Sequence, residues 1–180
     1  MLIVGLYSLK SAQVVLESRF SQELAEVHAM IAAVDSETVL ARSSRQRLKS
    51  LNQMIRQTFI ARQWQSQTLF CEYSLQHYTQ ELRDHPASKS STRELDFVKN
   101  KLGVDILFKN LKPAVYDICA EMTIFNNQGL IEAGIGIVPV QSFARTLSPK
   151  VAFFEQFVWD LQHRGVSDID IPVLILGVAA

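Results

Sequence analysis

The apolar run from Ile171 to Val178 is the feature that most restricts what this chain can fold into. A run of this kind that lacks polar alternation is typical of a strand buried on both faces of a sheet. Two further apolar segments, Val104–Phe108 and Leu130–Val138, are strand candidates, and helical patterns separate them. This alternation predicts an α/β fold in which helices flank a mixed central sheet.

Helix starts in the second half of the chain are marked by proline. Lys112-Pro113 and Ser148-Pro149 each precede an apolar pattern at helical spacing, and proline suits the first position of a helix. A further strand is expected at Leu95–Val98, and a tight turn near Lys101–Gly103 connects it to the next strand.

The first half of the chain is predicted to be mostly helical. A short strand, Leu2–Tyr7, precedes helices expected at Ser11–Ala33 and Ser44–Arg62, where apolar residues recur at helical spacing. Asp84–Thr92 is polar and contains proline, which indicates a loop. We expect a single domain over residues 1–180, in which residues 1–83 form a strand and a helical part and residues 94–180 form the core.

Charge is distributed unevenly although the formal net charge is zero. The segment from Thr38 to Cys71 contains no Asp or Glu. Its basic residues are Arg42, Arg45, Arg47, Lys49, Arg56 and Arg62. Such a block indicates either a surface that faces phosphates or an ordinary solvated helix face, and the sequence leaves both open.

Targeting and zinc-binding patterns are absent from the sequence. The opening MLIVGLYS has no basic leader and is too short for a signal peptide. No apolar run approaches the length of a membrane span. The two cysteines, Cys71 and Cys119, lie far apart without the His/Cys spacing of a zinc site. We therefore expect a soluble cytoplasmic protein.

Two aspartates, Asp96 and Asp105, are expected at the ends of the two predicted strands that the tight turn joins. Hydrolysis of a phosphodiester needs a divalent cation and an aligned water, and Mg²⁺ prefers oxygen ligands. Two acids in this position could bind one ion, and the backbone carbonyl of Ile106 could join them. Alternatively, Asp96 caps a turn and Asp105 pairs with a neighbouring lysine.

Leu107 occupies the position where a residue that holds the attacking water would be expected. It is two residues beyond Asp105 and so points to the same face of the strand, roughly 6.6 Å further along. Lys, Glu or Gln at this position could hold the water, but leucine has no hydrogen-bond donor or acceptor in its side chain.

Several blocks of the chain, taken in order, resemble type II restriction endonucleases of the BglII/BstYI type, within the PD-(D/E)xK superfamily. The blocks are LNQMIRQTFIARQW, LDFVKNKLGVDILF, AVYDICAEMTIF, GLIEAGIGIVPV and HRGVSDIDIPVLILGVAA. The resemblance covers most of the chain. It implies a restriction-endonuclease-like core with a mixed sheet flanked by helices, and an N-terminal helical part that clamps DNA.

The resemblance also implies a function. It predicts a homodimeric, Mg²⁺-dependent endonuclease, with Mn²⁺ as a substitute, that cuts double-stranded DNA at a short palindrome in a restriction-modification system. One metal site per subunit would serve each strand, and the Lys112–Phe125 helix would contribute to the dimer interface. The alternative is a catalytically impaired family member that acts as a sequence-specific DNA-binding dimer.

Catalytic roles follow from the resemblance position by position. Asp96 matches the first metal-binding Asp of the family, Asp105 matches its Glu, and Leu107 falls on its Gln. Gln67 and Glu121 are candidates to position the water instead, and the alternative for Glu121 is an ordinary solvent-exposed helix acid. We expect Leu107→Gln to leave activity equal or higher.

DNA-binding roles are implied for three groups of residues. Helical residues Arg42, Arg45, Arg47, Lys49 and Arg56 would contact phosphates, which set register without reading sequence. Base readout would come from Lys109 and Asn110, and from a loop at Gln141–Lys150. The candidates in that loop are Arg145, Ser148 and Lys150. Both readout segments are alternatively polar surface loops.

Overall fold

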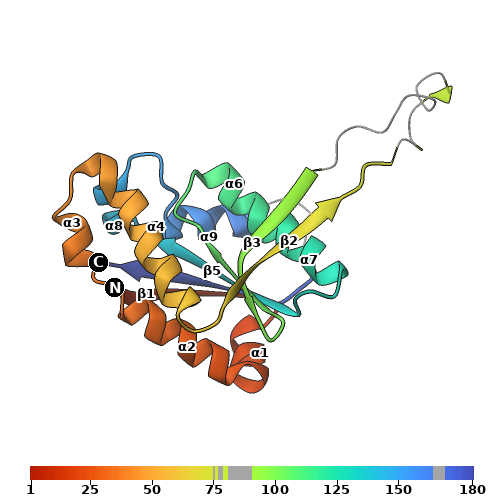
Figure 1. Ribbon diagram of the computed structural model, residues 1–180, viewed down its shortest axis with the longest axis horizontal. Helices are drawn as coiled ribbons and strands as arrows, with labels where there is room; N and C mark the ends of the chain where they lie inside the picture. The colour runs from red at the N-terminus through yellow and green to blue at the C-terminus, as the bar shows by residue number, and fades with distance from the viewer. Residues whose placement is uncertain (75, 77–78, 81–90, 164–168) are drawn as a thin grey trace.

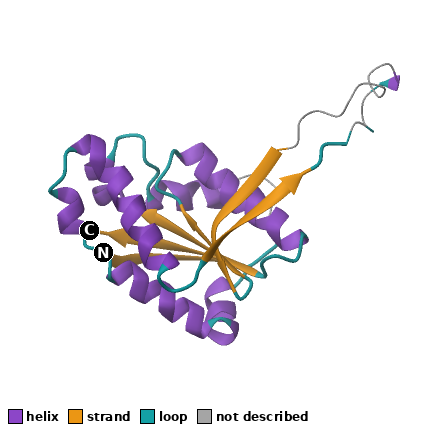
Figure 2. Cartoon of the chain, in the orientation of Figure 1, coloured by secondary structure: helices purple, strands orange, loops and turns teal. Residues whose placement is uncertain are grey.

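The computed structural model describes residues 1–74, 76, 79–80, 91–163 and 169–180, and these form one mixed sheet between two layers of helices (Figures 1 and 2). The strand order is β1-β6-β5-β4-β3-β2. The strands are β1 (Leu2–Leu9), β2 (Gln65–Cys71), β3 (Ser91–Lys99), β4 (Leu102–Ile106), β5 (Ala133–Pro139) and β6 (Val173–Ala179). Strands β4, β5 and β6 are parallel, whereas β1, β3 and β2 pair in antiparallel orientation.

Helices cover both faces of this sheet. They are α1 (Ala12–Arg19), α2 (Ser21–Ala32), α3 (Ser36–Leu40), α4 (Ser44–Ile60), α6 (Leu111–Tyr116), α7 (Met122–Asn127), α8 (Gln141–Leu147) and α9 (Phe154–His163). A π-helical turn, Asp117–Glu121, joins α6 to α7. Buried side chains of α1, α2, α4 and α8 pack on one face, and those of α6, α7 and α9 pack on the other. The predicted α/β fold with a mixed sheet is therefore confirmed.

The inner strands have the burial that their apolar sequences predict. Every residue of β4 and β5 is buried, and so is every residue of β6 except the last. Burial on both faces explains why these segments lack polar alternation. The residues that the structure describes include no helix with the length and apolar character needed to cross a membrane.

The β3–β4 hairpin turns at Asn100 and Lys101, slightly earlier in the chain than the predicted turn at Lys101–Gly103. Both residues have positive φ, 48° and 67°, as the two-residue turns that favour strand pairing require. Gly103 belongs to β4 itself. A side chain there would come within 2.7 Å of Leu95, so glycine at this position permits close packing.

Several predicted boundaries are wrong for identifiable reasons. The Ser11–Ala33 segment forms two helices because Phe20 has non-helical dihedral angles and a buried side chain. The Gln141–Lys150 segment contains helix α8, where a loop was predicted. Within the predicted Asp84–Thr92 loop, residues 84–90 lie outside the described residues, and the last two begin β3. Helix α3 and strand β2 were not predicted, because short or polar segments have weak periodicity.

Strand β3 belongs to two pairings, and this double role creates the site. Close to the turn it pairs with β4, at Phe97, Val98 and Lys99. From Leu95 back to Ser91 it pairs with β2. The β2–β3 ribbon extends away from the body of the molecule in Figure 1. Strands β3 and β4 therefore separate at Asp96.

Candidate active site

Asp96 lies at the fork where β3 separates from β4. The last β3–β4 pair joins Phe97 to Val104, and one further step of this register would set Asp96 opposite Asp105. A bulge also occurs here, because β3 advances from Val98 to Leu95 while β2 advances only from Gln65 to Gln67. A β-bulge redirects side chains and is common beside active sites.

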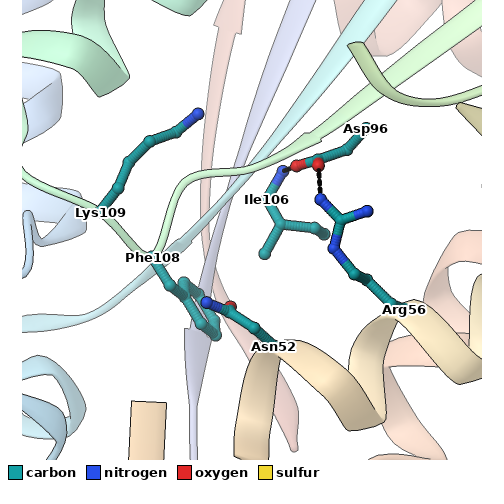
Figure 3. A pocket seen from close by; sticks show the side chains of 6 residues that line it. All are labelled: Asn52, Arg56, Asp96, Ile106, Phe108 and Lys109. Carbon is teal, nitrogen blue, oxygen red and sulfur yellow. Dashed lines mark hydrogen bonds and ion pairs between the residues drawn. The ribbon is translucent and has the colours of Figure 1, made fainter. Parts of the chain in front are cut away.

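The Asp96 carboxylate is fixed from two sides (Figure 3). Its Oδ2 accepts a hydrogen bond of 2.9 Å from the backbone N–H of Ile106, so the side chain replaces the partner that the departing strand would have supplied. Its Oδ1 forms an ion pair with the guanidinium of Arg56, which comes from α4. Both contacts orient the carboxylate toward the end of β4.

Asp105 is buried, with 3% of the residue exposed. Burial raises the pKa of its carboxyl well above the usual range, and a hydrogen bond to Asp96 and the negative charge of Asp96 act in the same direction. The positive charge of Lys109 opposes them. The structure thus brings together the two acids that the sequence pairs, and it holds them in unfavourable proximity when both are charged.

The donor set at the fork fits a hard divalent cation. Two carboxylates converge there, and Ile106, whose carbonyl the sequence suggests as a third ligand, lines the same pocket. Within the described ranges, no three His, Cys, Asp or Glu side chains gather closely enough to enclose a metal. A site with few protein oxygens suits Mg²⁺, which retains several of its waters.

The pocket above the fork is lined by residues from three segments of the chain (Figure 3). They are Asn52, Arg56, Asp96, Ile106, Phe108 and Lys109. Asn52 is not among the site residues expected from the sequence. Its Oδ1 is buried without a hydrogen-bond partner among the described residues, and such an atom needs an explanation. The sequence signal for Asn52 is its place in the LNQMIRQ block, one helical turn before Arg56.

Lys109 contacts two acids, and 37% of its side chain is exposed. Its Nζ lies 3.4 Å from Oδ2 of Asp105 and forms an ion pair with the buried Asp117, at the start of the π-helical turn. Burial alone would lower the pKa of Lys109, but the charges of Asp105 and Asp117 raise it overall. The lysine is therefore held as a cation beside the fork.

Glu121 lies behind this lysine and completes a chain of charges. Burial raises the pKa of Glu121, and a hydrogen bond with Asp117 and the charge of Asp117 add to the effect. Its carboxylate lies 3.6 Å from the guanidinium of Arg93. The sequence pattern pointed to Glu121 but not to Asp117. Their separation by one helical turn would have identified the pair.

Leu107 is part of the core and does not line the pocket. It is fully buried, and a side chain on Gly136 would come within 2.9 Å of its Cδ1 and 3.0 Å of Ile118. Its N–H donates a 2.9 Å hydrogen bond to the carbonyl of Ile137 in β5. The side chain thus fills space between the sheet and the α6–α7 layer.

The remaining predicted residues lie in varied places. Gln67 is half-buried on β2, where its amide contacts the Thr68 carbonyl at 3.4 Å, and it does not line the pocket. Arg47 donates to the carbonyls of Arg42 and Thr146 at 3.0 Å each, so it joins α4 to α8. The exposed residues are Arg42, Arg45, Lys49, Asn110, Arg145 and Lys150, whereas Ser148 is half-buried.

One stripe of α4 leads from the surface into the pocket. Arg45, Lys49, Asn52 and Arg56 follow one another at spacings of three or four residues, so they lie on the same side of the helix. Two of them line the pocket, and the other two are exposed cations. The stripe is therefore a basic surface that ends at the paired acids.

We expect Asp105→Asn to stabilise the metal-free protein at neutral pH. A carboxyl whose pKa is higher in the folded protein than in the unfolded chain makes the free energy of unfolding fall as pH rises from about 4, the ordinary Asp value. Removing the charge removes this cost. The Tm should exceed that of the parent by about 2 °C or more at pH 7, roughly the effect of 1 kcal/mol in a chain of this size.

Thermal melts in EDTA across pH 4 to 8 test this expectation. The difference in Tm between Asp105→Asn and the parent should widen as pH rises. Asp160→Asn, on α9 and outside the pocket, is the control and should show no such trend. Equal Tm values for Asp105→Asn and the parent over the whole range would contradict the raised pKa.

Comparisons with known proteins agree with this geometry. Residues 4–178 match the family model described as restriction endonuclease BglII/BglIII. The crystal structure of BglII complexed with a DNA 16-mer is similar at TM-score 0.62 and 14% identity, over 96% of this chain and 74% of that one. Free BglII is similar at TM-score 0.59 and 14% identity, over 98% and 79%. A search of curated proteins found no matching relative.

Proposed function

The chain belongs to the BglII/BglIII restriction endonuclease family, and from this premise we propose that it is a Mg²⁺-dependent endonuclease that cuts double-stranded DNA at a specific site. The observation that carries the proposal is the meeting of Asp96 and Asp105 at the β3–β4 fork, where the basic stripe of α4 ends. Paired acids alone would repel a DNA phosphate. Paired acids that hold a divalent cation would attract it.

Asp96, Asp105 and the carbonyl of Ile106 are the groups that would hold the ion. When bound, Mg²⁺ (or Mn²⁺ in its place) neutralises charge on the scissile phosphate and favours deprotonation of a bound water. The chain supplies the preorganisation for this. The Ile106 N–H orients Asp96, and burial shields Asp105 from competing solvent.

Phosphate contacts are assigned to the exposed cations around α4. Arg45 and Lys49 extend the line of Arg56 along the stripe, and Arg42 lies beside Lys49 in a polar recess. Arg47 of α4 is hydrogen-bonded to α8. Arg145 belongs to α8 and therefore lies on a helix next to α4. These side chains would fix the register of the duplex. Asn110, Ser148 and Lys150 remain the candidates for base readout.

A homodimer acting on a palindrome completes the proposal, because a two-fold protein matches a two-fold DNA site. The α6–α7 segment is the proposed interface, and its Tyr116 is partly exposed. The similar BglII structure contains a DNA 16-mer, which supports duplex DNA as the ligand. The corresponding cellular role is restriction of foreign DNA in the cytoplasm.

The experiment that tests the proposal is digestion of phage DNA of known sequence by the purified protein, with Mg²⁺ and with EDTA. Discrete fragments that appear only with Mg²⁺ are the expected result, and mapping their ends gives the recognition site. A mobility shift without cutting under any divalent ion would contradict the nuclease assignment and favour a DNA-binding dimer.

Arg56 pairs with a carboxylate that would bind the metal, so it competes with the ion in the absence of DNA. We expect Arg56→Ala to strengthen Mn²⁺ binding by the DNA-free protein up to about fivefold, because an exposed ion pair contributes about 1 kcal/mol or less. Calorimetric titration measures this affinity. Arg45→Ala is the control, because it removes an equal positive charge from the same helix without removing the ion-pair partner of Asp96. This variant should leave Mn²⁺ affinity unchanged. Weaker Mn²⁺ binding by Arg56→Ala than by the parent would show that Arg56 does not compete with the ion.

A further inference from the structure

Among the residues that the structure describes, Lys109 is the cation that contacts Asp105, and the sequence suggested a different role for it. An exposed lysine at this position could read a base, but this lysine lies 3.4 Å from Asp105 and is paired with Asp117. In Figure 3 it rises on the opposite side of Ile106 from Arg56, so that cations flank the fork on both sides. A side chain held in this way is directed at the acids beside the fork.

The backbone at Lys109 is anchored by a hydrogen bond and by the buried side chain that precedes it. Its carbonyl accepts a 2.9 Å hydrogen bond from the N–H of Ala152. The preceding Phe108 is buried and packs edge-to-face on Phe143 at 6.4 Å. The direction of the lysine therefore comes from the fold itself.

Asp117 is buried between Lys109, its ion-pair partner, and Glu121, to which it is hydrogen-bonded. A buried carboxylate is costly unless it is paired, and Lys109 supplies the pairing charge. The acid begins a π-helical turn, a rare geometry that is frequent at functional sites. The turn projects Asp117 toward the end of β4.

We propose that Lys109 is the third catalytic residue of the site, in place of the polar residue that Leu107 cannot supply, and that Asp117 is the residue that positions it. The inference rests on the proposed function. Lys109 donates a hydrogen bond to the phosphate oxygen and to the attacking water. The water oxygen forms the new bond to phosphorus and loses a proton to solvent. The bond from phosphorus to the leaving oxygen breaks, and that oxygen takes a proton from solvent. Lys109 keeps its protons throughout.

Single-turnover cleavage of a fragment that the parent protein cuts tests the role. We expect Lys109→Met to lower the cleavage rate about 10²–10³-fold, the usual effect of removing one preorganised charge donor. Binding of the same fragment in EDTA should change less than about fivefold. Lys10→Met, in the exposed turn between β1 and α1, is the matched control and should cut at the parental rate.

The double variant Lys109→Met/Asp117→Asn separates catalysis from stability. It removes Lys109 together with Asp117, so Asp117 does not remain as a buried acid without its cation. If the lysine served only to neutralise Asp117, this variant would regain parental cleavage, and the inference would be overturned. We expect it to melt near the parental Tm and to remain as slow as Lys109→Met. Asp117→Asn alone should slow cleavage in the parent but have no further effect when Lys109 is absent.

The outcomes distinguish this inference from the proposed function. A parent protein that cuts DNA, together with a folded Lys109→Met that cuts equally fast, overturns only the role of the lysine. A parent protein that cuts no DNA overturns the nuclease assignment and the inference with it.

Discussion

Asp96→Asn is expected to abolish DNA cleavage while leaving DNA binding equal or stronger. The substitution preserves size and keeps an acceptor for the Ile106 N–H, but it removes one of the two charges that would hold the cation. Metal ions stabilise the transition state by several kcal/mol, so the rate should fall by about 10³-fold or more. Binding should persist because the variant removes a negative charge near phosphate and releases Arg56 from its ion pair.

Cleavage assays and mobility shifts on the same fragment measure the two effects separately. Glu94→Gln is the matched control, because it neutralises an exposed acid of the same strand. That variant should cut at the parental rate. If Asp96→Asn cut DNA at the parental rate, Asp96 would not be a residue of the active site. If the variant lost both DNA binding and cleavage, the loss would indicate a folding defect.

Leu107→Gln is expected to destabilise the protein by about 2–4 kcal/mol, which combines the lost burial of leucine with the cost of an amide in an apolar space. The sequence alone suggested that glutamine would preserve or improve activity. Burial changes this expectation, because Leu107 packs with Ile118 and Ile175 above Gly136. The corresponding fall in Tm is about 5–15 °C.

Thermal or urea unfolding measures this loss, and Leu107→Met provides the control. Methionine conserves volume, so it should cost less than about 1.5 kcal/mol. A Leu107→Gln protein as stable as the parent would show that the glutamine amide finds a hydrogen-bond partner. Higher cleavage activity in that case would restore the original expectation.

Local sequence was sufficient for the central strands and for the proximity of the acids. Full apolar runs identify strands buried on both faces, because only a sheet covered on both sides removes every side chain from water. A two-residue turn between Asp96 and Asp105 brings the acids together through short-range geometry. Helix α4 was equally visible, since its apolar positions recur every three or four residues.

Tertiary structure decided which groups surround the acids. Arg56 reaches Asp96 from a separate helix, and Asp117 reaches Lys109 from the start of the π-helical turn. The sheet register, including the bulge that turns Asp96, follows from the pairing of β3 with two different strands.

By itself, the sequence of this protein determined a mixed sheet between helices and two acids beside one turn, because periodicity and spacing act over a few residues. Only the tertiary structure decided that Leu107 belongs to the core and that Lys109 contacts Asp105. Both outcomes depend on helices and strands from distant parts of the chain, whose packing sets where water is excluded and which charges must pair.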